Sequence, residues 1–426
     1  MSEKKKKSER KITGRDFLKG AAAVATIVAA IGVFSTGLMS CDDGSGDFTY
    51  RGNLDAVTQN SNVSSTITVP AGKTIESPYT GVNWNTYGQY KSALHTHSTR
   101  SDGANTLAQM IEEKYRQDFD IVAMTDHNIT NYSWTAGLGR LDEARYNAMV
   151  AGTAPKMNLD GTLAASARGR PILRLSHTNE QSNGEHMNSF FADFNNASGA
   201  TLESNIVATE NANGISFINH IGRYSHRNNP DTAIGVQVSN DPEQINKYAD
   251  LFLAYPSCVG MEIMNRRDRE TYADRVLWDN ILKVTVPEGR NVWGFSTDDS
   301  HSNAPSENGN SYSMLIMPAL TEAAARKAME DGHHYAVAKV SKFELGNSFY
   351  GDGRFPPTIK SITVNAGSIT ITTENITRID WISDGVVIGS TTASTTTFDV
   401  TKVGSYIRAN LMGPGGIAFT QPFIIE

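Results

Sequence analysis

Two histidines one residue apart, His95 and His97, open a pattern that is suited to metal-ion chemistry. Side chains at positions i and i+2 of an extended strand point to the same face, so both imidazoles would face one site. Asp102 follows shortly after His97. Neutral imidazole and carboxylate are common ligands of zinc, manganese and iron. The segment therefore predicts a divalent-metal site.

Residues of the same types recur along the chain, each after an apolar run. They are His127 in Thr125-Asp126-His127, His220 after the run at 214–218, and Asp299 and His301 in Asp298-Asp299-Ser300-His301. All ten histidines lie between residues 95 and 334. Histidines that only filled the core would not be confined in this way, so the distribution favours one shared site.

The elements that would position these residues alternate between short apolar runs and amphipathic segments. The apolar runs lie at 92–94, 120–124, 172–175, 214–218, 259–264, 292–295 and 313–317, and the helical patterns lie at 107–116, 141–150, 243–252, 273–284 and 322–330. Strands that alternate with helices of this length indicate βα units around a parallel sheet, and six or seven units favour a closed barrel. The polar candidates follow the runs, at the strand ends where barrel enzymes place catalytic groups.

The pattern changes near residue 355, at Phe355-Pro356-Pro357. Short β-like runs then follow with no helical stretch, at 359–364, 368–373, 378–382, 386–388, 396–400, 405–411 and 419–425. They predict a small all-β domain, an Ig-like sandwich, over residues 355–426. Residues 41–88 are rich in Ser, Thr, Asn and Gly, and we interpret them as a linker with one peripheral strand.

Residues 1–40 have the organisation of an export signal. A basic segment precedes 18 uncharged residues at 21–38, and Leu38-Met39-Ser40-Cys41 resembles a bacterial lipobox. That resemblance implies cleavage before Cys41 and acylation of its thiol, which would anchor the exported chain to a membrane at its periplasmic or cell-surface face. Residues 13–19 resemble a twin-arginine motif with Gly14 in place of the first arginine, so both the Tat and the Sec routes stay open. An uncleaved transmembrane anchor is the alternative.

Charge and cysteine content narrow the function classes. The formal net charge is −7, and because residues 1–20 carry eight basic and three acidic residues, the rest of the chain carries −12. An acidic protein of this kind is not expected to have a specific nucleic-acid partner. The two cysteines, Cys41 and Cys258, offer no disulfide framework. No phosphate-binding P-loop, nucleophile elbow or dinucleotide fingerprint is present.

The ordered set of motifs resembles the PHP (polymerase and histidinol phosphatase) superfamily over residues 89–345, with features of its CehA/McbA-like branch. The resemblance implies a distorted (β/α)7 barrel that holds three divalent ions, of zinc, manganese or iron. It implies three ligand sets: His95, His97, Glu180 and Asp299; Glu180, His186 and His220; and Asp102, His127 and His301. For the pair Glu180 and His186, Glu185 and His177 are competing candidates.

These residues predict an exported hydrolase that acts on ester bonds, most simply a phosphoesterase that uses a metal-bound hydroxide. Glu180 and Asp299 would hold the catalytic ions. Arg223, three residues after His220, would grip the phosphate of a small phosphorylated substrate. Two alternatives remain: a metal-dependent amide, carbamate or carboxylic ester hydrolase, and a catalytically inactive surface binding lipoprotein.

The other polar residues near these motifs are given supporting roles. Asp126 and Asp298 are predicted to orient imidazoles. The segment 260–265, which includes Glu262, is assigned a structural role. The histidines predicted to serve only as hydrogen-bonding residues are His177, His226, His333 and His334.

Overall fold

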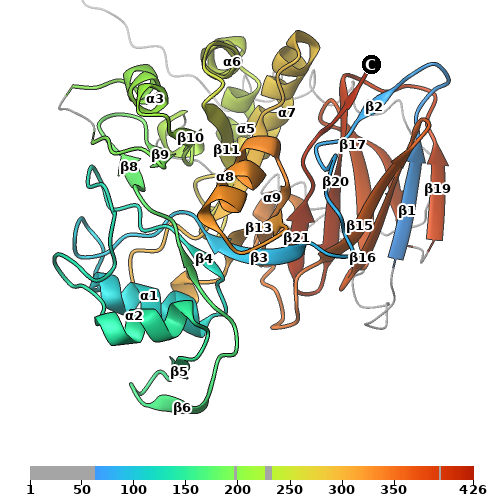
Figure 1. The fold of residues 1–426 in the computed structure, drawn as a ribbon. Coiled ribbons are helices and arrows are strands. Elements are labelled where there is room, and N and C mark those ends of the chain that lie inside the picture. Colours follow the sequence, from blue (N-terminus) through green and yellow to red (C-terminus); the bar gives the residue numbers. More distant parts are fainter. Residues whose placement is uncertain (1–62, 196–198, 226–232, 393–394) are drawn as a thin grey trace, which may run out of the picture. The chain divides into compact units, whose positions relative to one another are not determined.

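The computed structural model describes residues 63–195, 199–225, 233–392 and 395–426, all within one compact unit. The predicted export signal, Cys41, residues 41–62 of the predicted linker and His226 lie outside these ranges. Within them, no helix is both long and apolar enough to cross a bilayer. The fold is mixed α/β with a strand-rich C-terminal region (Figure 1).

Two sheets carry the region of the predicted barrel. One sheet has the order β12 (Trp293–Thr297), β11 (Cys258–Asn265), β10 (Ile215–Ile218), β9 (Met187–Phe190) and β8 (Asn179–Gln181). The other includes β14 (His334–Ala338), β13 (Ser311–Met317), β3 (Gly88–Ala93), β4 (Ile121–Val122) and β7 (Leu173–Arg174). The described strands therefore divide between two open sheets.

Strand directions are mixed, which corrects the expectation of an all-parallel sheet. β3, β4 and β7 are parallel neighbours, as are β10, β11 and β12. β13 runs antiparallel to both β3 and β14, and β9 runs antiparallel to β8 and β10. The short connection between β8 and β9 contains no helix, which permits antiparallel pairing, whereas β13 and β14 pair antiparallel although the helix Glu322–Asp331 lies between them in the chain.

The predicted helices are present, and the structure adds others. α1 (Leu107–Arg116), α2 (Glu143–Val150), α6 (Pro242–Ala254), α7 (Asp274–Thr285) and α8 (Glu322–Asp331) match the helical patterns of the sequence. α1 begins at a capping box in which Thr106 and Gln109 satisfy each other's backbone N–H groups. The additional helices are α3 (Leu202–Asn211), α4 (Gly222–Ser225), α5 (Ala233–Ser239) and α9 (Lys342–Leu345).

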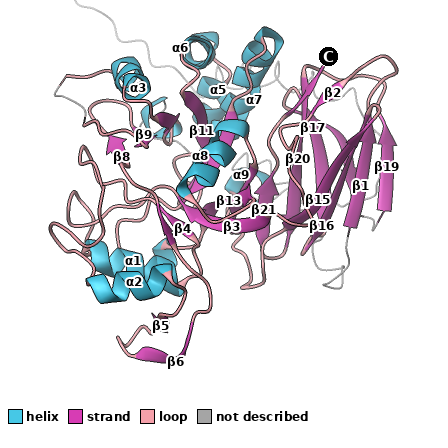
Figure 2. Cartoon of the chain, viewed as in Figure 1, coloured by secondary structure: helices cyan, strands magenta, loops and turns pink. Residues whose placement is uncertain are grey.

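The C-terminal strands form two facing layers (Figure 2). One is a four-stranded sheet in which β1 (Val63–Thr68) lies between β16 (Ser368–Glu374) and β19 (Thr395–Asp399), with β15 (Thr358–Asn365) at its edge. The other contains β17 (Arg378–Ser383), β18 (Val386–Thr391), β20 (Tyr406–Gly413), β21 (Gly416–Phe419) and β22 (Phe423–Ile425), which pairs with β2 (Ile75–Glu76). The indole of Trp381 in β17 donates to Ser65 Oγ in β1 (2.8 Å), which joins the layers. A small hairpin of β5 (Pro155–Met157) and β6 (Leu163–Ala167) stands apart.

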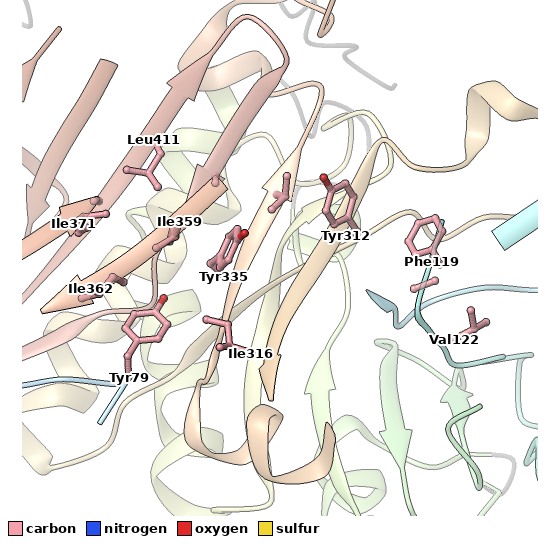
Figure 3. Packing of buried hydrophobic residues seen from close by; sticks show 14 of the residues in the cluster. Tyr79, Phe119, Val122, Tyr312, Ile316, Tyr335, Ile359, Ile362, Ile371 and Leu411 are labelled. Atoms are coloured by element: carbon pink, nitrogen blue, oxygen red, sulfur yellow. The ribbon is translucent and has the colours of Figure 1, made fainter. Parts of the chain in front are cut away.

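The strand-rich region is joined to the rest of the fold by a continuous ladder and a continuous core. β21 pairs with β14 in antiparallel register, so one sheet passes from one region into the other. Figure 3 shows the same continuity in the core, where Tyr335 and Ile316 pack beside Ile359 and Leu411. The sheet that contains β3, which leads to His95 and His97, is therefore continuous with the strand-rich region.

Candidate metal centre

His95 and His97 follow strand β3, and both side chains are fully buried. The backbone between them is fixed from two directions. Thr96 N donates to Thr125 Oγ1 (3.0 Å), and His97 N donates to the carbonyl of Ser300 (2.8 Å). The segment thus lies between the ends of β4 and β12, where the other predicted ligands emerge.

Asp102 is presented by a tight turn. The turn closes when Gly103 N donates to the carbonyl of Ser98 (2.9 Å). A β-carbon at Gly103 would lie 2.8 Å from three backbone atoms of Ser98, so only glycine fits this close approach. The carboxylate of Asp102 is half-exposed, at the rim of the site.

Three predicted ligands come from the β8–β10 side. Glu180 lies in β8, His186 directly precedes β9, and His220 follows β10. Glu180 and His220 are buried, and His186 is nearly so. An isolated parallel bridge between His127 and Glu180 brings the end of β4 against β8.

Asp299 and His220 have left-handed backbone conformations that non-glycine residues rarely adopt. The φ angles are +45° for Asp299 and +26° for His220. Such strain persists where the surroundings enforce it, and it gathers at functional sites. At His220 the constraint is a hydrogen bond from its backbone N to Glu262 Oε2 (2.9 Å).

The nine predicted ligands converge, with Glu180 at the centre. Its Oε1 lies 2.9 Å from His186 Nδ1, 3.3 Å from His95 Nε2 and 3.5 Å from His220 Nε2. Its Oε2 lies 2.8 Å from His127 Nδ1 and 3.3 Å from His97 Nε2. One carboxylate therefore contacts five imidazoles.

Asp299 is the second centre of the cluster. Its Oδ1 lies 3.2 Å from His97 Nε2, 3.3 Å from His95 Nε2 and 3.4 Å from His301 Nδ1. Asp102 completes the set at the rim, because its Oδ2 lies 3.2 Å from His301 Nε2 and 3.4 Å from His127 Nε2. Four groups of residues could hold an ion: His97 with Asp102, His127 and His301; His95 with His97 and Glu180; His95 with His220 and Asp299; and His127 with Glu180 and His186.

The central carboxylates are poised to remain charged. Burial raises the pKa of Glu180, but His95 and the other imidazoles outweigh it and hold that pKa well below its ordinary range. The same balance of burial against His95, His97 and Arg266 holds the pKa of Asp299 well below its usual value. Ligand carboxylates must be deprotonated to bind a cation, so both are prepared for that role.

The cluster also contains buried polar atoms without any hydrogen-bond partner among the described residues. They include His95 Nε2, His97 Nε2, Glu180 Oε2 and Asp299 Oδ1, all directed at one another. Buried polar atoms normally have hydrogen-bond partners, and a role in holding an ion is one recognised reason for exceptions. Six imidazoles and three carboxylates are also the donor set that zinc, manganese or iron accepts. The residues present thus fit divalent metal ions.

Glu262 in β11 orients the centre, a contact that its assignment to a structural role did not anticipate. Its Oε1 accepts a hydrogen bond from His95 Nδ1 (2.8 Å), which leaves His95 Nε2 directed at Glu180 and Asp299. Thr297 Oγ1 donates to the same oxygen (2.5 Å). A carboxylate that receives the second ring nitrogen fixes the tautomer and orientation of a metal-binding histidine. The sequence did contain a signal for this role: Glu262 is a lone carboxylate inside an apolar strand, and a buried carboxylate requires a partner.

Among the described residues, Arg266 is a cation in direct contact with the cluster, and the sequence analysis did not select it. Its Nε lies 3.1 Å from Asp299 Oδ2, and its Nη2 lies 2.8 Å from His301 Nδ1. Arg223, the predicted phosphate-binding residue, is 46% exposed on α4, and its nearest carboxylate is Glu270, at 3.8 Å. The backbone N of Arg223 donates to the carbonyl of His220 (3.0 Å), but its guanidinium has no hydrogen bond or ion pair with the cluster among the described residues.

Several other candidate residues near the metal centre have hydrogen-bond partners outside it. Glu185 is bound by Lys247 and by the hydroxyl of Tyr248 (3.1 Å). Asp126 accepts from Ser98 N (2.7 Å), and Asp298 accepts from three backbone N–H groups at 309–311. Neither carboxylate has a hydrogen bond or ion pair with an imidazole of the described residues, so the prediction that they orient imidazoles is wrong.

The three remaining described histidines also lie outside the cluster. His333 Nε2 lies 3.1 Å from the carbonyl of Thr80, and His334 Nδ1 accepts from Gln421 Nε2 (3.1 Å). His177 has a left-handed backbone, and its carbonyl accepts from Ala192 N (3.2 Å). None of them joins a group of described residues that could hold an ion.

Searches of known proteins return structural likenesses only. A two-domain protein from Bacteroides vulgatus, containing a predicted PHP-like metal-dependent phosphoesterase, is 14% identical with a TM-score of 0.42, over 80% of this chain and 88% of that one. An amidohydrolase from Chromobacterium violaceum is 16% identical with a TM-score of 0.31, over 50% and 87%. A lesion-specific endonuclease from Pyrococcus furiosus is 16% identical with a TM-score of 0.33, over 57% and 56%.

No protein-family model matches the chain, and no curated protein matches it. At these identities and TM-scores the structural likenesses do not establish a family.

Proposed function

We propose that this chain is a metal-dependent hydrolase of phosphoesters, acting on a small phosphorylated substrate. The observation that carries the proposal is the convergence of nine ligand-type side chains with unpaired buried donor atoms, beside the guanidinium of Arg266. A planar guanidinium is suited to the oxygens of a phosphoryl group. An amide or carbamate substrate would place no anionic oxygens there before reaction.

In this proposal three divalent ions occupy the ligand sets that the PHP resemblance implies. Ions held there would lower the pKa of bound water to about 7 and stabilise charge on the reacting ester. Glu180 would help to hold the first two ions, because it belongs to both of their ligand sets: its Oε1 lies near His186 and His220, and its Oε2 lies near His97. Three carboxylates offset about half of the positive charge of three ions.

The chain's own groups would prepare the ester for attack. Glu262 holds His95 in one tautomer, so a ligand nitrogen is fixed before substrate arrives. Arg266, which is 42% exposed, is open to solvent and so accessible to substrate oxygens. Preorganised charges of this kind act most strongly on the charge that develops in the transition state.

The test uses His95→Ala and Asp299→Asn, with His333→Ala as the matched control outside the cluster. Both site variants should lose bound metal and hydrolysis of p-nitrophenyl phosphate together, whereas the control should keep both. Metal content is measured on the purified protein, and folding is checked by circular dichroism. A site variant with full activity would contradict the proposal. Faster hydrolysis of aryl carboxylic esters or anilides than of the phosphate would point to the amide and ester alternative.

The finer fold assignment belongs to the same proposal. We interpret the two open sheets as a distorted (β/α)7 PHP barrel of the CehA/McbA-like branch, followed by an Ig-like sandwich. Two isolated parallel bridges, Thr96 to Ser300 and His127 to Glu180, support this interpretation because they link strand ends of the two sheets. Strand β1 would belong with the sandwich, since both its ladder partners are C-terminal strands.

Export as a lipoprotein acylated at Cys41 is also proposed, on the lipobox-like residues 38–41 alone. The substrate would then be met outside the cytoplasm. Cells that produce the full chain and are treated with globomycin should accumulate a precursor of lower mobility. Unchanged mobility would contradict the lipoprotein assignment.

A further inference from the structure

We infer that the loop 265–270, which leaves β11 beside the candidate metal centre, is a binding subsite for a second anionic group of the substrate. The inference rests on the proposed function and names the substrate class more closely. The substrate would be a phosphoester whose alcohol part carries its own carboxylate or phosphate. Three arginines of this loop carry the argument: Arg266, Arg267 and Arg269.

The loop is held rigidly from below by Asp268, which is fully buried. Both of its carboxylate oxygens are bound by the equally buried Arg275 (2.6 and 2.9 Å), and Lys342 N donates to it (2.7 Å). Arg266 and Asp268 have left-handed φ angles of +50° and +56°. A backbone in this conformation is maintained by its surroundings, so the arginines around Asp268 project from a fixed frame.

The outward arginines are not neutralised by carboxylates. Arg267 is exposed, its Nη2 donates to the carbonyl of Ser306 (2.7 Å), and its guanidinium lies 5.8 Å from the ring centre of Tyr350. Arg269 is exposed and has no hydrogen bond or ion pair with any residue that the structure describes. Neither guanidinium has a carboxylate partner among the described residues, so both can bind an anion.

The acidic groups nearby do not cancel this charge. Asp268 is already paired with Arg275, and Glu270 is shared with Arg223, with its Oε2 3.8 Å from Arg223 Nη1. Glu307, at 305–307, acts on Arg266 electrostatically without a direct contact. The chain as a whole has a formal charge of −7, so the charge of this cationic loop is opposite in sign to the net charge of the protein. A local field of opposite sign at a site concentrates charged substrate there.

The order of the arginines along the loop gives each a place on the substrate. Arg266 reaches the cluster through Asp299 and His301, so it belongs with the phosphoryl group that reacts. Consecutive α-carbons are about 3.8 Å apart, and an arginine side chain extends farther than that. Arg267 and Arg269 follow Arg266 by one and three residues and are exposed, so we assign them to the alcohol part of the ester.

Two ligands that differ by one anionic group test the inference. Glycerol 3-phosphate and 3-phosphoglycerate share the phosphoester, but the first carries a neutral CH2OH group where the second carries a carboxylate. Their binding to the metal-loaded full chain is measured by isothermal titration calorimetry. The wild type should bind 3-phosphoglycerate about three- to tenfold more tightly, the range for one or two exposed charge pairs. In the double variant Arg267→Gln/Arg269→Gln, the ratio of the two dissociation constants should approach one.

The control is Arg170→Gln/Arg326→Gln, which removes the same charge from arginines that lie elsewhere. Arg170 pairs with Asp118 and Asp120 before β4, and Arg326 pairs with Glu330 on α8. The control should retain the wild-type ratio. A double loop variant that retains it would overturn the inference, because the carboxylate would then bind elsewhere, for example at the metals. A wild type that binds neither ligand, or both equally, would also overturn it.

The proposed function is tested by a separate measurement, the hydrolysis of p-nitrophenyl phosphate. A protein that shows the predicted binding ratios without hydrolysis would support the subsite and refute the phosphoesterase. A protein that hydrolyses p-nitrophenyl phosphate without any preference between the two ligands would do the reverse.

Discussion

Replacing Glu262 by glutamine tests whether the centre depends on a residue that does not itself face the ions. Glu262 is fully buried and accepts four hydrogen bonds, from His95 Nδ1, His220 N, Thr297 Oγ1 and Asn265 Nδ2. Glutamine has almost the same shape but only one acceptor oxygen, and its amide group would meet donors. At least one donor would then be left unpaired.

The size of the effect follows from these contacts. A hydrogen bond to a charged group contributes about 1.5–3 kcal/mol, so loss of the bond that orients His95 should weaken metal binding by about ten- to a hundredfold. Loss of the hydrogen bond from His220 N to Glu262 should weaken metal binding further, because that bond maintains the φ of +26° at His220. Affinity is measured by competition with a fluorescent zinc chelator, and stability by thermal unfolding of the metal-free protein.

The matched control is Glu322→Gln. Glu322 also accepts bonds from a backbone N and a hydroxyl, those of Ser176 (2.8 and 2.7 Å), but it lies at the start of α8 outside the cluster. This variant should lose stability without losing metal affinity. The reasoning would be refuted if Glu262→Gln bound metal as tightly as the wild type, or if both variants lost affinity in proportion to their stability.

Three further predictions concern the frame around the centre. Gly103→Ala should weaken metal binding without abolishing folding, because the new β-carbon would collide with Ser98 at 2.8 Å; metal titration and melting together check this. Burial lowers the pKa of His334 to about 3. A folded-state pKa below the unfolded value of 6.5 means that stability is complete above pH 6.5 and is lost as the pH falls towards 3, by on the order of 5 kcal/mol. Urea unfolding at a series of pH values should show this slope in the wild type and a smaller one in His334→Gln. Arg408→Met should cost about 3–5 kcal/mol, because it leaves the buried Asp279 carboxylate without its two contacts of 2.7 Å; an unchanged melting temperature would contradict it.

The sequence predicted helices well where amphipathic periodicity and capping agree. The pattern at 107–116 and the helix α1 have the same bounds, because Thr106 and Gln109 mark its start and the apolar positions repeat on one face. α3 gave no such signal. Its buried positions include Asn205 and Thr209, which an apolar pattern does not register.

The strands nearest the centre were the hardest to predict, for a related reason. β8 consists of Asn179, Glu180 and Gln181, all buried, and β9 also buries Asn188 and Ser189. Strands are recognised from apolar alternation, but these line a polar site, so their inward side chains are polar. Glu180 was found from the motif order instead. The direction of β13 was equally inaccessible, because hydrophobic pattern does not encode the direction of pairing.

The adjacent aspartates Asp298 and Asp299 show how position along a strand end decides function. Both residues follow the end of β12 at Thr297, and the backbone at Asp299 is left-handed, with a φ of +45°. Asp299 turns into the cluster, whereas Asp298 binds Lys114 Nζ (3.1 Å), which in turn donates to Ser300 Oγ (2.7 Å). Lys114 is fully buried on α1, and burial lowers its pKa while Asp298 raises it.

Lys114 therefore ties the helix α1 to the turn that carries Asp299 and His301. Ser300 also accepts His97 N through its carbonyl, so the same residue holds both halves of the cluster in register. Asp298→Asn should then leave Lys114 as a buried cation with a weakened partner, and metal affinity should fall together with stability. Asp299→Asn should also lower metal affinity, but it should cost the metal-free protein less stability than Asp298→Asn does, because Arg266, the cation beside Asp299, is 42% exposed and can be solvated, whereas Lys114 is fully buried. Melting curves of both metal-free variants distinguish the two roles; equal loss of stability in both would show that the two aspartates are not divided in this way.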